Sequence, residues 1–108
     1  MGPLTQNEIL ILAVLRSTER YGSELMEQVE ALTKGHYRLS LGGLYTTLHR
    51  MEKKGLITGR WGDRRSEEPN AQRRYYRITG MGQRVLAEAE AALTPALRAV
   101  RAAGGSRP

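Results

Sequence analysis

Residues 39–57 read LSLGGLYTTLHRMEKKGLI, and this stretch determines how the flanking sequence is interpreted. Placed at about 100° per residue, four large apolar side chains fall on one face, which predicts an amphipathic helix. These four residues are Leu41, Leu44, Leu48 and Met51. Ser40 is a suitable N-cap for this helix, and Gly55 is a suitable residue to end it. The apolar face is expected to pack against a core.

Two glycines, Gly42 and Gly43, stand in the first turn of this helix, where each costs roughly 0.5–1 kcal/mol relative to alanine. Gly42 lies on the outward face, at the end where free N–H groups and the positive dipole end favour phosphate. The rest of that face is small or polar, with Tyr45 and Arg50 at its borders and Thr46, His49 and Lys53 between them. Close approach of a DNA backbone would explain the glycines. Helix–helix packing is the alternative for either glycine alone.

The amino-acid composition excludes several kinds of functional site and indicates a basic surface. The 108 residues are enough for one domain with a small core, and the absence of cysteine excludes disulfides, thiolate metal sites and cysteine nucleophiles. The net charge is +6, and residues 34–77 carry eleven Lys or Arg against four acidic residues, while the rest carries six against seven. Such a segregated excess is typical of a phosphate-binding surface. A solvated basic surface is the alternative.

The flanking sequence predicts three more helices and a hairpin. Thr5 and Glu8 form a capping box for a first helix through about Ser17, and a second helix follows a turn at Tyr21 and Gly22 and ends near Gly35. Residues 56–61 and 73–79 read as strands joined by a charged tip. A hairpin directly after a helix-turn-helix is typical of a winged helix. The predicted fold class is mainly α with a small β-hairpin, a winged helix-turn-helix followed by a C-terminal dimerisation helix.

A last helix is predicted from Gly80 to about Ala103, with Thr79 as its cap. Large and small residues alternate along one side at heptad spacing, which favours contact with the same helix of a second chain. The predicted dimerisation residues are Leu86, Ala89, Leu93, Ala96, Leu97 and Val100. Folding of this helix back on its own core is the alternative, and Pro95 predicts either a kink or a separate last helix. The predicted organisation is a DNA-binding domain over residues 1–79, a dimerisation helix over 80–103 and a disordered tail over 104–108.

The sequence resembles the PadR family of bacterial transcriptional regulators over roughly residues 5–86. The matching segments are YGSEL at 21–25, GLY at 43–45, LHRME at 48–52, GLI at 55–57 and RYYRIT at 74–79, followed by Gly82. The resemblance implies a homodimeric winged-helix repressor that reads a palindromic operator, and the chain length suggests the short subfamily with a single C-terminal helix. Several short members bind flat aromatic ligands between protomers, but this sequence has no aromatic residue after Tyr76. A small-molecule or protein effector therefore remains unassigned.

The predicted helix at 41–54 is expected to enter the major groove of double-stranded DNA. Thr46 and His49 would face base edges, Arg50 would contact a guanine or a phosphate, and Lys53 would meet the backbone. Tyr45 suits a phosphate contact or a half-buried core position. In the hairpin, arginines could reach phosphate or the minor groove, or pair with neighbouring acids. The predicted DNA-binding residues are Ser40, Gly42, Gly43, Tyr45, Thr46, His49, Arg50, Lys53, Arg64, Arg65, Arg73 and Arg74. Trp61 and one of Tyr75 and Tyr76 are expected to fill the core behind the hairpin.

Enzymatic and metal-binding functions find little support in the sequence. No phosphate loop, nucleophile elbow or metalloprotease motif occurs, and His36 and His49 lack matched acidic partners. No cofactor is expected. No apolar run is long enough to span a membrane, and a cytoplasmic location is expected. Two alternatives remain beside a sequence-specific regulator: a winged-helix adaptor for an acidic protein, and an architectural binder of DNA without sequence preference.

Overall fold

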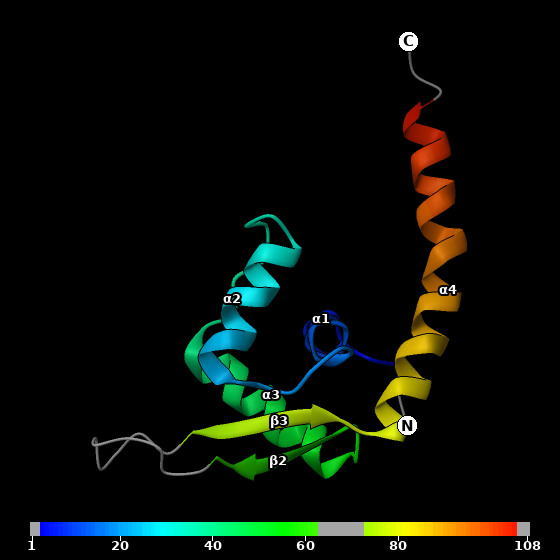
Figure 1. Ribbon diagram of the computed structural model, residues 1–108. Helices are drawn as coiled ribbons and strands as arrows, with labels where there is room; N and C mark the ends of the chain where they lie inside the picture. Colours follow the sequence, from blue (N-terminus) through cyan, green and yellow to red (C-terminus); the bar gives the residue numbers. More distant parts are fainter. Residues whose placement is uncertain (1–2, 63–72, 106–108) are drawn as a thin grey trace.

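The computed structural model describes residues 3–62 and 73–105. The elements run α1 (Gln6–Leu15), β1 (Arg20–Tyr21), α2 (Gly22–Leu32), α3 (Leu41–Lys53), β2 (Ile57–Trp61), β3 (Arg74–Ile78) and α4 (Gly80–Gly105). Figure 1 shows α1 between the α2–α3 pair and the long α4, with the strands along the side of the molecule where α3 lies. The predicted winged helix-turn-helix with a C-terminal helix is confirmed. The first two helices end earlier than predicted, at Leu15 and Leu32.

The core is formed by one face of each helix and by the inner residues of the sheet. Leu44, Leu48 and Met51 of α3 are fully buried, as the spacing predicts, and Tyr76 is buried at 3% exposure. The prediction of a core position is wrong for two residues, because Leu41 and Trp61 are each 59% exposed. Leu41 is the first residue of α3, and Trp61 is the last residue of β2. Both therefore lie at element ends, where helical or strand periodicity no longer decides which side is covered.

The sheet has three strands rather than the two of the predicted hairpin, in the order β1-β3-β2. Arg20 pairs with Tyr76 and Tyr21 with Tyr75, so the predicted turn at Tyr21 is in fact an edge strand. β2 and β3 are antiparallel with Ile57 opposite Ile78. We call the β2–β3 hairpin, residues 57–78, the wing. Its predicted charged tip, with Arg64 and Arg65, lies outside the described residues.

Helix α4 is continuous across Pro95 and reaches Gly105, two residues beyond the predicted end. The predicted cap is present, because Thr79 Oγ1 accepts a hydrogen bond from Gly82 N at 3.1 Å. Thr94 Oγ1 donates to the Glu90 carbonyl at 2.7 Å, on the turn that precedes the proline. The separate last helix proposed as one possibility is therefore not formed. Of the predicted disordered tail, Gly104 and Gly105 are helical and residues 106–108 lie outside the described residues.

Candidate nucleic-acid interface

The N-terminal end of α3 is capped by a side chain and open to solvent. Ser40 Oγ accepts a hydrogen bond from Gly43 N at 3.1 Å. Among the residues that the structure describes, a Cβ at Gly42 would meet nothing within 4 Å, whereas one at Gly43 would lie 2.9 Å from Ser40 Oγ. Gly43 is therefore explained by the cap itself. Packing among the described residues does not explain the small size of Gly42.

Further along α3, the predicted outward residues share one exposed surface. Thr46, His49, Arg50 and Lys53 are all exposed, while Thr47, between them in sequence, is buried. We call the exposed set, together with Gly42, the α3 face. It carries hydroxyl, imidazole, guanidinium and ammonium groups and no large apolar side chain. Such a face suits hydrogen bonding to base edges and phosphates.

Tyr45 borders the α3 face at 46% exposure and reaches toward the start of α2. A Cβ at Gly22 would lie 2.6 Å from the Tyr45 hydroxyl oxygen, so Gly22 makes room for that ring. Tyr45 also lines an open groove of about 490 Å³ with Ser23 of α2 and Arg73 of the wing. The groove thus brings a phenol, a hydroxyl and a guanidinium together between α2, α3 and the wing.

Two arginines predicted to bind DNA make contacts inside the domain. Arg74 Nη2 donates to Glu52 Oε2 at 3.1 Å, and its guanidinium lies 5.3 Å from the centre of the Trp61 ring. Arg73 lies over the Tyr21 ring, 4.4 Å from its centre. The sequence-based alternative of internal pairing thus applies to Arg74, although its partner is Glu52 rather than an acid of the wing tip.

One acidic residue behind the α3 face was predicted only as part of a cap. The capping box is confirmed: Thr5 N donates to Glu8 Oε1 at 2.8 Å, and Glu8 N donates to Thr5 Oγ1 at 3.2 Å. Glu8 is also fully buried, and its Oε2 accepts a hydrogen bond from Lys54 Nζ at 3.0 Å and lies 3.6 Å from Arg50 Nε. Burial raises the pKa of this carboxyl, but the Thr5 N–H and the Lys54 ammonium outweigh burial and hold the pKa below its usual value of 4.5.

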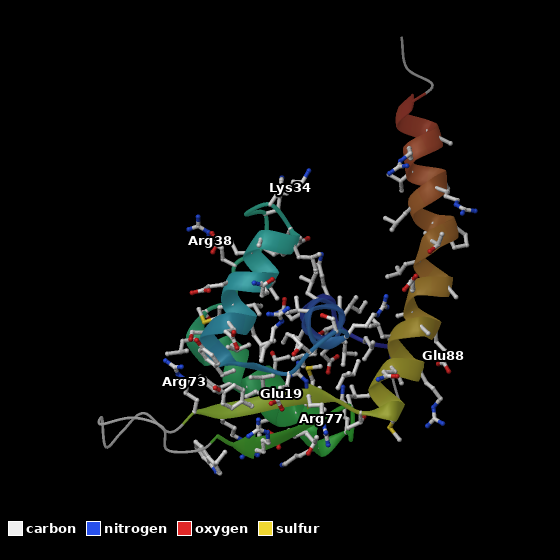
Figure 2. The ribbon with its side chains drawn as sticks, in the orientation of Figure 1. Glu19, Lys34, Arg38, Arg73, Arg77 and Glu88 are labelled. Atoms are coloured by element: carbon white, nitrogen blue, oxygen red, sulfur yellow. The ribbon has the colours of Figure 1, made fainter. Side chains whose placement is uncertain are left out.

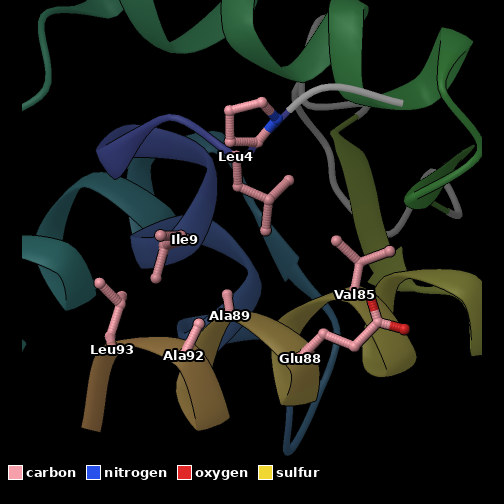
Figure 3. Close-up of a pocket in the computed structure, with 8 residues that line it drawn as sticks. Leu4, Ile9, Val85, Glu88, Ala89, Ala92 and Leu93 are labelled. Atoms are coloured by element: carbon pink, nitrogen blue, oxygen red, sulfur yellow. The ribbon is translucent and has the colours of Figure 1, made fainter. Parts of the chain in front are cut away.

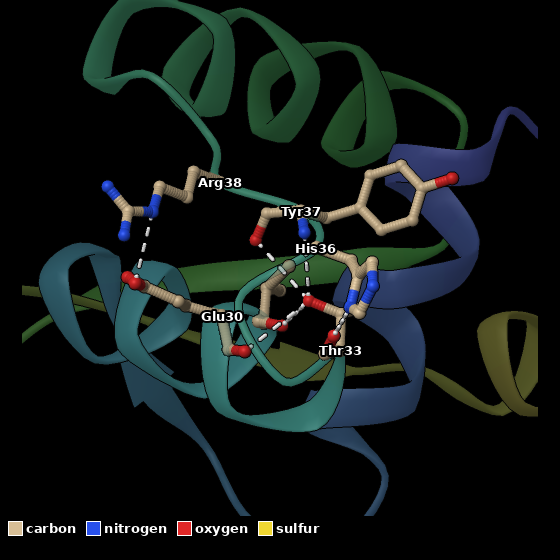
Figure 4. Close-up of polar contacts among 6 residues, drawn as sticks. Glu30, Thr33, His36, Tyr37 and Arg38 are labelled. Carbon is tan, nitrogen blue, oxygen red and sulfur yellow. Dashed lines mark hydrogen bonds and ion pairs between the residues drawn. The ribbon is translucent and has the colours of Figure 1, made fainter.

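The basic residues of the 34–77 window do not form one surface. Figure 2 shows Lys34 and Arg38 at the far end of α2, well separated from Arg73, which directly precedes β3, and from Arg77 on β3. Figure 4 shows the loop between α2 and α3. There Arg38 Nε pairs with Glu30 Oε1 of α2 at 3.1 Å, and His36 Nδ1 lies 2.9 Å from the Thr33 carbonyl oxygen. The charge excess therefore overstates the extent of the candidate interface. Within the described residues, no group of three or more His, Asp or Glu side chains could hold a metal ion.

The predicted dimerisation residues divide into two sets. Leu86 is buried in the domain's own core at 4% exposure, which corrects its assignment to an intermolecular seam. Leu93, Leu97 and Val100 are 43%, 65% and 70% exposed, and Ala96 is exposed among them. Ala89 and Leu93 line a largely apolar pocket of about 380 Å³ that Leu4 and Ile9 close from the other side (Figure 3). Beyond residue 90, α4 thus carries an apolar stripe that its own chain leaves open.

Among the described residues, no helix has the length and apolar character needed to cross a membrane.

A family model and a similar protein both relate this chain to transcriptional regulators. The family model described as the transcriptional regulator PadR-like family matches residues 11–88 of this chain. Transcriptional regulator Rv3488 of Mycobacterium tuberculosis is similar, with 37% identity over 90 residues, 83% of this chain and 78% of that protein.

Solved structures agree with that comparison. A PadR family transcription regulator from Clostridium difficile matches with a TM-score of 0.74 and 26% identity, covering 90% of this chain and 95% of the other. Bacillus subtilis PadR, solved in complex with operator DNA, shares the fold with a TM-score of 0.69 at 19% identity, covering 82% of this chain and 48% of the other. Family and fold are those of transcriptional regulators rather than enzymes.

Proposed function

Because the chain belongs to the PadR-like family of transcriptional regulators, we propose that it binds double-stranded DNA as a homodimer and represses transcription from a palindromic operator. Helix α3 is the recognition helix in this proposal, and the wing contacts the flanking backbone. The proposed site of action is the cytoplasm, where such a regulator meets its operator.

The observation that carries the proposal is the composition of the α3 face. Gly42 is open at the N-terminal end of α3, and Thr46, His49 and Lys53 continue the same exposed surface along the helix. An adaptor that bound another protein here would need large apolar anchors, and the α3 face itself has none, although the exposed Leu41 lies beside it at the start of the helix. Bacillus subtilis PadR, which shares the fold, was solved with operator DNA. Operator binding by this chain is proposed by analogy with that protein.

The homodimer is supported by the stripe on α4. Leu93, Leu97 and Val100 follow one another at i, i+4 and i+7, all exposed in the single chain. Three large aliphatic side chains on one helical stripe lose water contact when a second copy packs against them. Two recognition helices related by a two-fold axis would then read two half-sites, which explains why a palindrome is proposed.

The proposal is tested by selecting bound sequences from a random duplex library at about 150 mM salt, with the parent chain and the Arg50→Ala and Arg73→Ala variants in parallel. Enrichment of a two-fold palindrome by the parent is expected, with relaxed preference at one base position in Arg50→Ala if Arg50 reads a guanine. Arg73→Ala is expected to weaken binding without changing the enriched sequence, since a phosphate contact carries no base information.

Other results of these experiments would support a different function for the protein. Binding with a steep salt dependence but no enriched sequence would show an architectural DNA binder instead. No duplex binding at all would contradict the proposal. Repression itself is tested by placing the enriched palindrome between a promoter and a reporter: lower expression with the protein present is expected, and higher expression would show an activator.

A further inference from the structure

The recognition helix has a contact on its inner side that the proposed function does not use. Glu8 belongs to α1, which contacts both α3 and α4. Within residues 3–62 and 73–105, Glu8 and Thr47 are the buried polar side chains, and Glu8 has no exposed surface. A carboxylate removed from water is costly unless charged and hydrogen-bonding groups compensate for the lost solvation. The groups that compensate for this cost are the ones that stabilise Glu8 in its buried position.

The two carboxylate oxygens of Glu8 have different partners. Oε1 accepts the Thr5 N–H at 2.8 Å and belongs to the N-terminal cap of its own helix. Oε2 faces α3, with Lys54 Nζ at 3.0 Å and Arg50 Nε at 3.6 Å. The hydrogen bond to Oε1, which caps α1, explains why a glutamate occurs at this position of the helix. It does not explain why Arg50 of α3 and Lys54, the residue that caps the end of α3, both lie near the other oxygen.

The closest approach of Arg50 to Glu8 is through Nε, at an ion-pair distance of 3.6 Å. A guanidinium is planar, and its two terminal NH2 groups form the fork that matches guanine or phosphate. The Arg50 side chain is 44% exposed on the α3 face, which gives an external partner access to it. The Arg50 side chain thus lies within ion-pair distance of a buried charge and is still partly open to solvent.

We propose that Glu8 is a positioning residue for Arg50: its buried carboxylate fixes the guanidinium so that the terminal NH2 groups point outward from the α3 face. This inference rests on the proposed function, because it concerns how α3 meets DNA. Fixing a flexible arginine before binding removes rotamer entropy that the complex would otherwise lose. Lys54 supplies the second positive charge that keeps Glu8 ionised in its buried position.

The test is a double-mutant cycle measured as affinity for the fluorescein-labelled duplex that the parent enriches. Glu8→Gln keeps the size of the side chain and its acceptor for Thr5 N–H but removes the charge. It is expected to weaken binding about tenfold in the parent and less than twofold in Arg50→Ala, because coupled residues are not additive. Lys53→Ala is the matched control, since Lys53 is exposed on the same helix. In that background Glu8→Gln should again cost about tenfold.

A purely structural role for Glu8 would give a different pattern. Equal weakening in the Arg50 and Arg50→Ala backgrounds overturns the inference, and so does unchanged or tighter binding by Glu8→Gln, which would mean that Glu8 withholds Arg50 from DNA. Folding of each variant is checked by circular dichroism, and Glu8→Asp replaces Glu8→Gln in the cycle if the latter is unfolded. A parent that binds no duplex overturns the proposed function and this inference together. A binding parent with an additive cycle overturns the inference alone.

Discussion

Arg74 of strand β3 donates a hydrogen bond to Glu52 of helix α3 across 3.1 Å, and this pair attaches the wing to that helix. The guanidinium lies across Gly59 of β2, where an added Cβ would come within 2.8 Å of Arg74 Nε. Because Gly59 has no side chain, the Arg74 side chain can pass over β2 and reach α3. A residue that the sequence assigns to DNA thus also sets how the wing and α3 lie relative to each other.

The first prediction concerns this pair. Both side chains are less than one-third exposed, at 29% and 28%. A double-mutant cycle with Arg74→Ala and Glu52→Gln, measured by urea unfolding at pH 7, should give a coupling of about 0.5–1 kcal/mol. Arg77→Ala on the exposed side of the same strand is the control and should be additive with Glu52→Gln. Additivity of Arg74→Ala with Glu52→Gln would show that the pair contributes nothing to stability.

The second prediction compares two glycines in the first turn of α4. A Cβ at Gly82 would lie 2.2 Å from the Leu56 carbonyl oxygen and 2.8 Å from Ile78 Cγ1, and backbone cannot move aside as a side chain can. Gly82→Ala should therefore destabilise the domain by about 1–3 kcal/mol. A Cβ at Gly80 would meet none of the described atoms within 4 Å, so Gly80→Ala should change stability by less than about 0.5 kcal/mol. Thermal unfolding followed by circular dichroism compares the two, and equal transition temperatures would contradict the packing argument.

Much of the fold could be predicted from the sequence, because periodicity and capping act locally. The face of Leu44, Leu48 and Met51, the Thr5–Glu8 capping box and the Gly55 turn, with φ +77°, were all predicted correctly. Strand β1 has two residues, too few for an alternating pattern, and exists through pairing with β3.

The internal partners at the candidate site could not be predicted in the same way. Lys54 meets Glu8 across 46 positions of sequence, and Arg74 meets Glu52 across 22. Such partners depend on how helices and strands pack, which spacing along the chain does not encode. A glutamate in a nearly all-apolar helix was the one available signal, and the capping box already accounted for it.

The third prediction tests whether Gly42 is small for the sake of DNA. Because a Cβ at Gly42 would meet nothing within 4 Å in the described part of the chain, Gly42→Ala should stabilise the fold by up to about 1 kcal/mol. Gly42→Leu should also fold normally but should weaken binding to the enriched duplex at least about tenfold, since its side chain holds the helix away from the groove. Chemical denaturation and fluorescence anisotropy measure the two effects. Full duplex affinity in Gly42→Leu would mean that this end of α3 does not approach DNA.

The fourth prediction is a pH dependence of stability. The pKa of Glu8 lies below its usual 4.5 in the folded chain, so the folded state favours the charged form. The stabilisation is then fully present above pH 4.5 and is lost as pH falls through the lower folded-state pKa. At pH 7, Glu8→Gln should be less stable than the parent by about 1–2 kcal/mol, because Lys54 loses a charged partner. In urea unfolding from pH 7 to pH 3, this difference should narrow below about pH 4.5. A constant difference would show that the charge of Glu8 is not what stabilises the fold.

The fifth prediction concerns the stripe on α4. Leu97 is 65% exposed between Leu93 and Val100, and Leu97→Glu should prevent two stripes from packing together. Sedimentation should then show a monomer, and affinity for the palindromic duplex should fall at least about 100-fold, because the second half-site is no longer engaged by a linked recognition helix. Ala99→Glu adds the same charge about 200° around the helix and should remain dimeric with unchanged affinity. A dimer in both variants would place the interface elsewhere on the chain, whereas a monomeric Leu97→Glu that keeps its full affinity would mean that a single domain reads the operator.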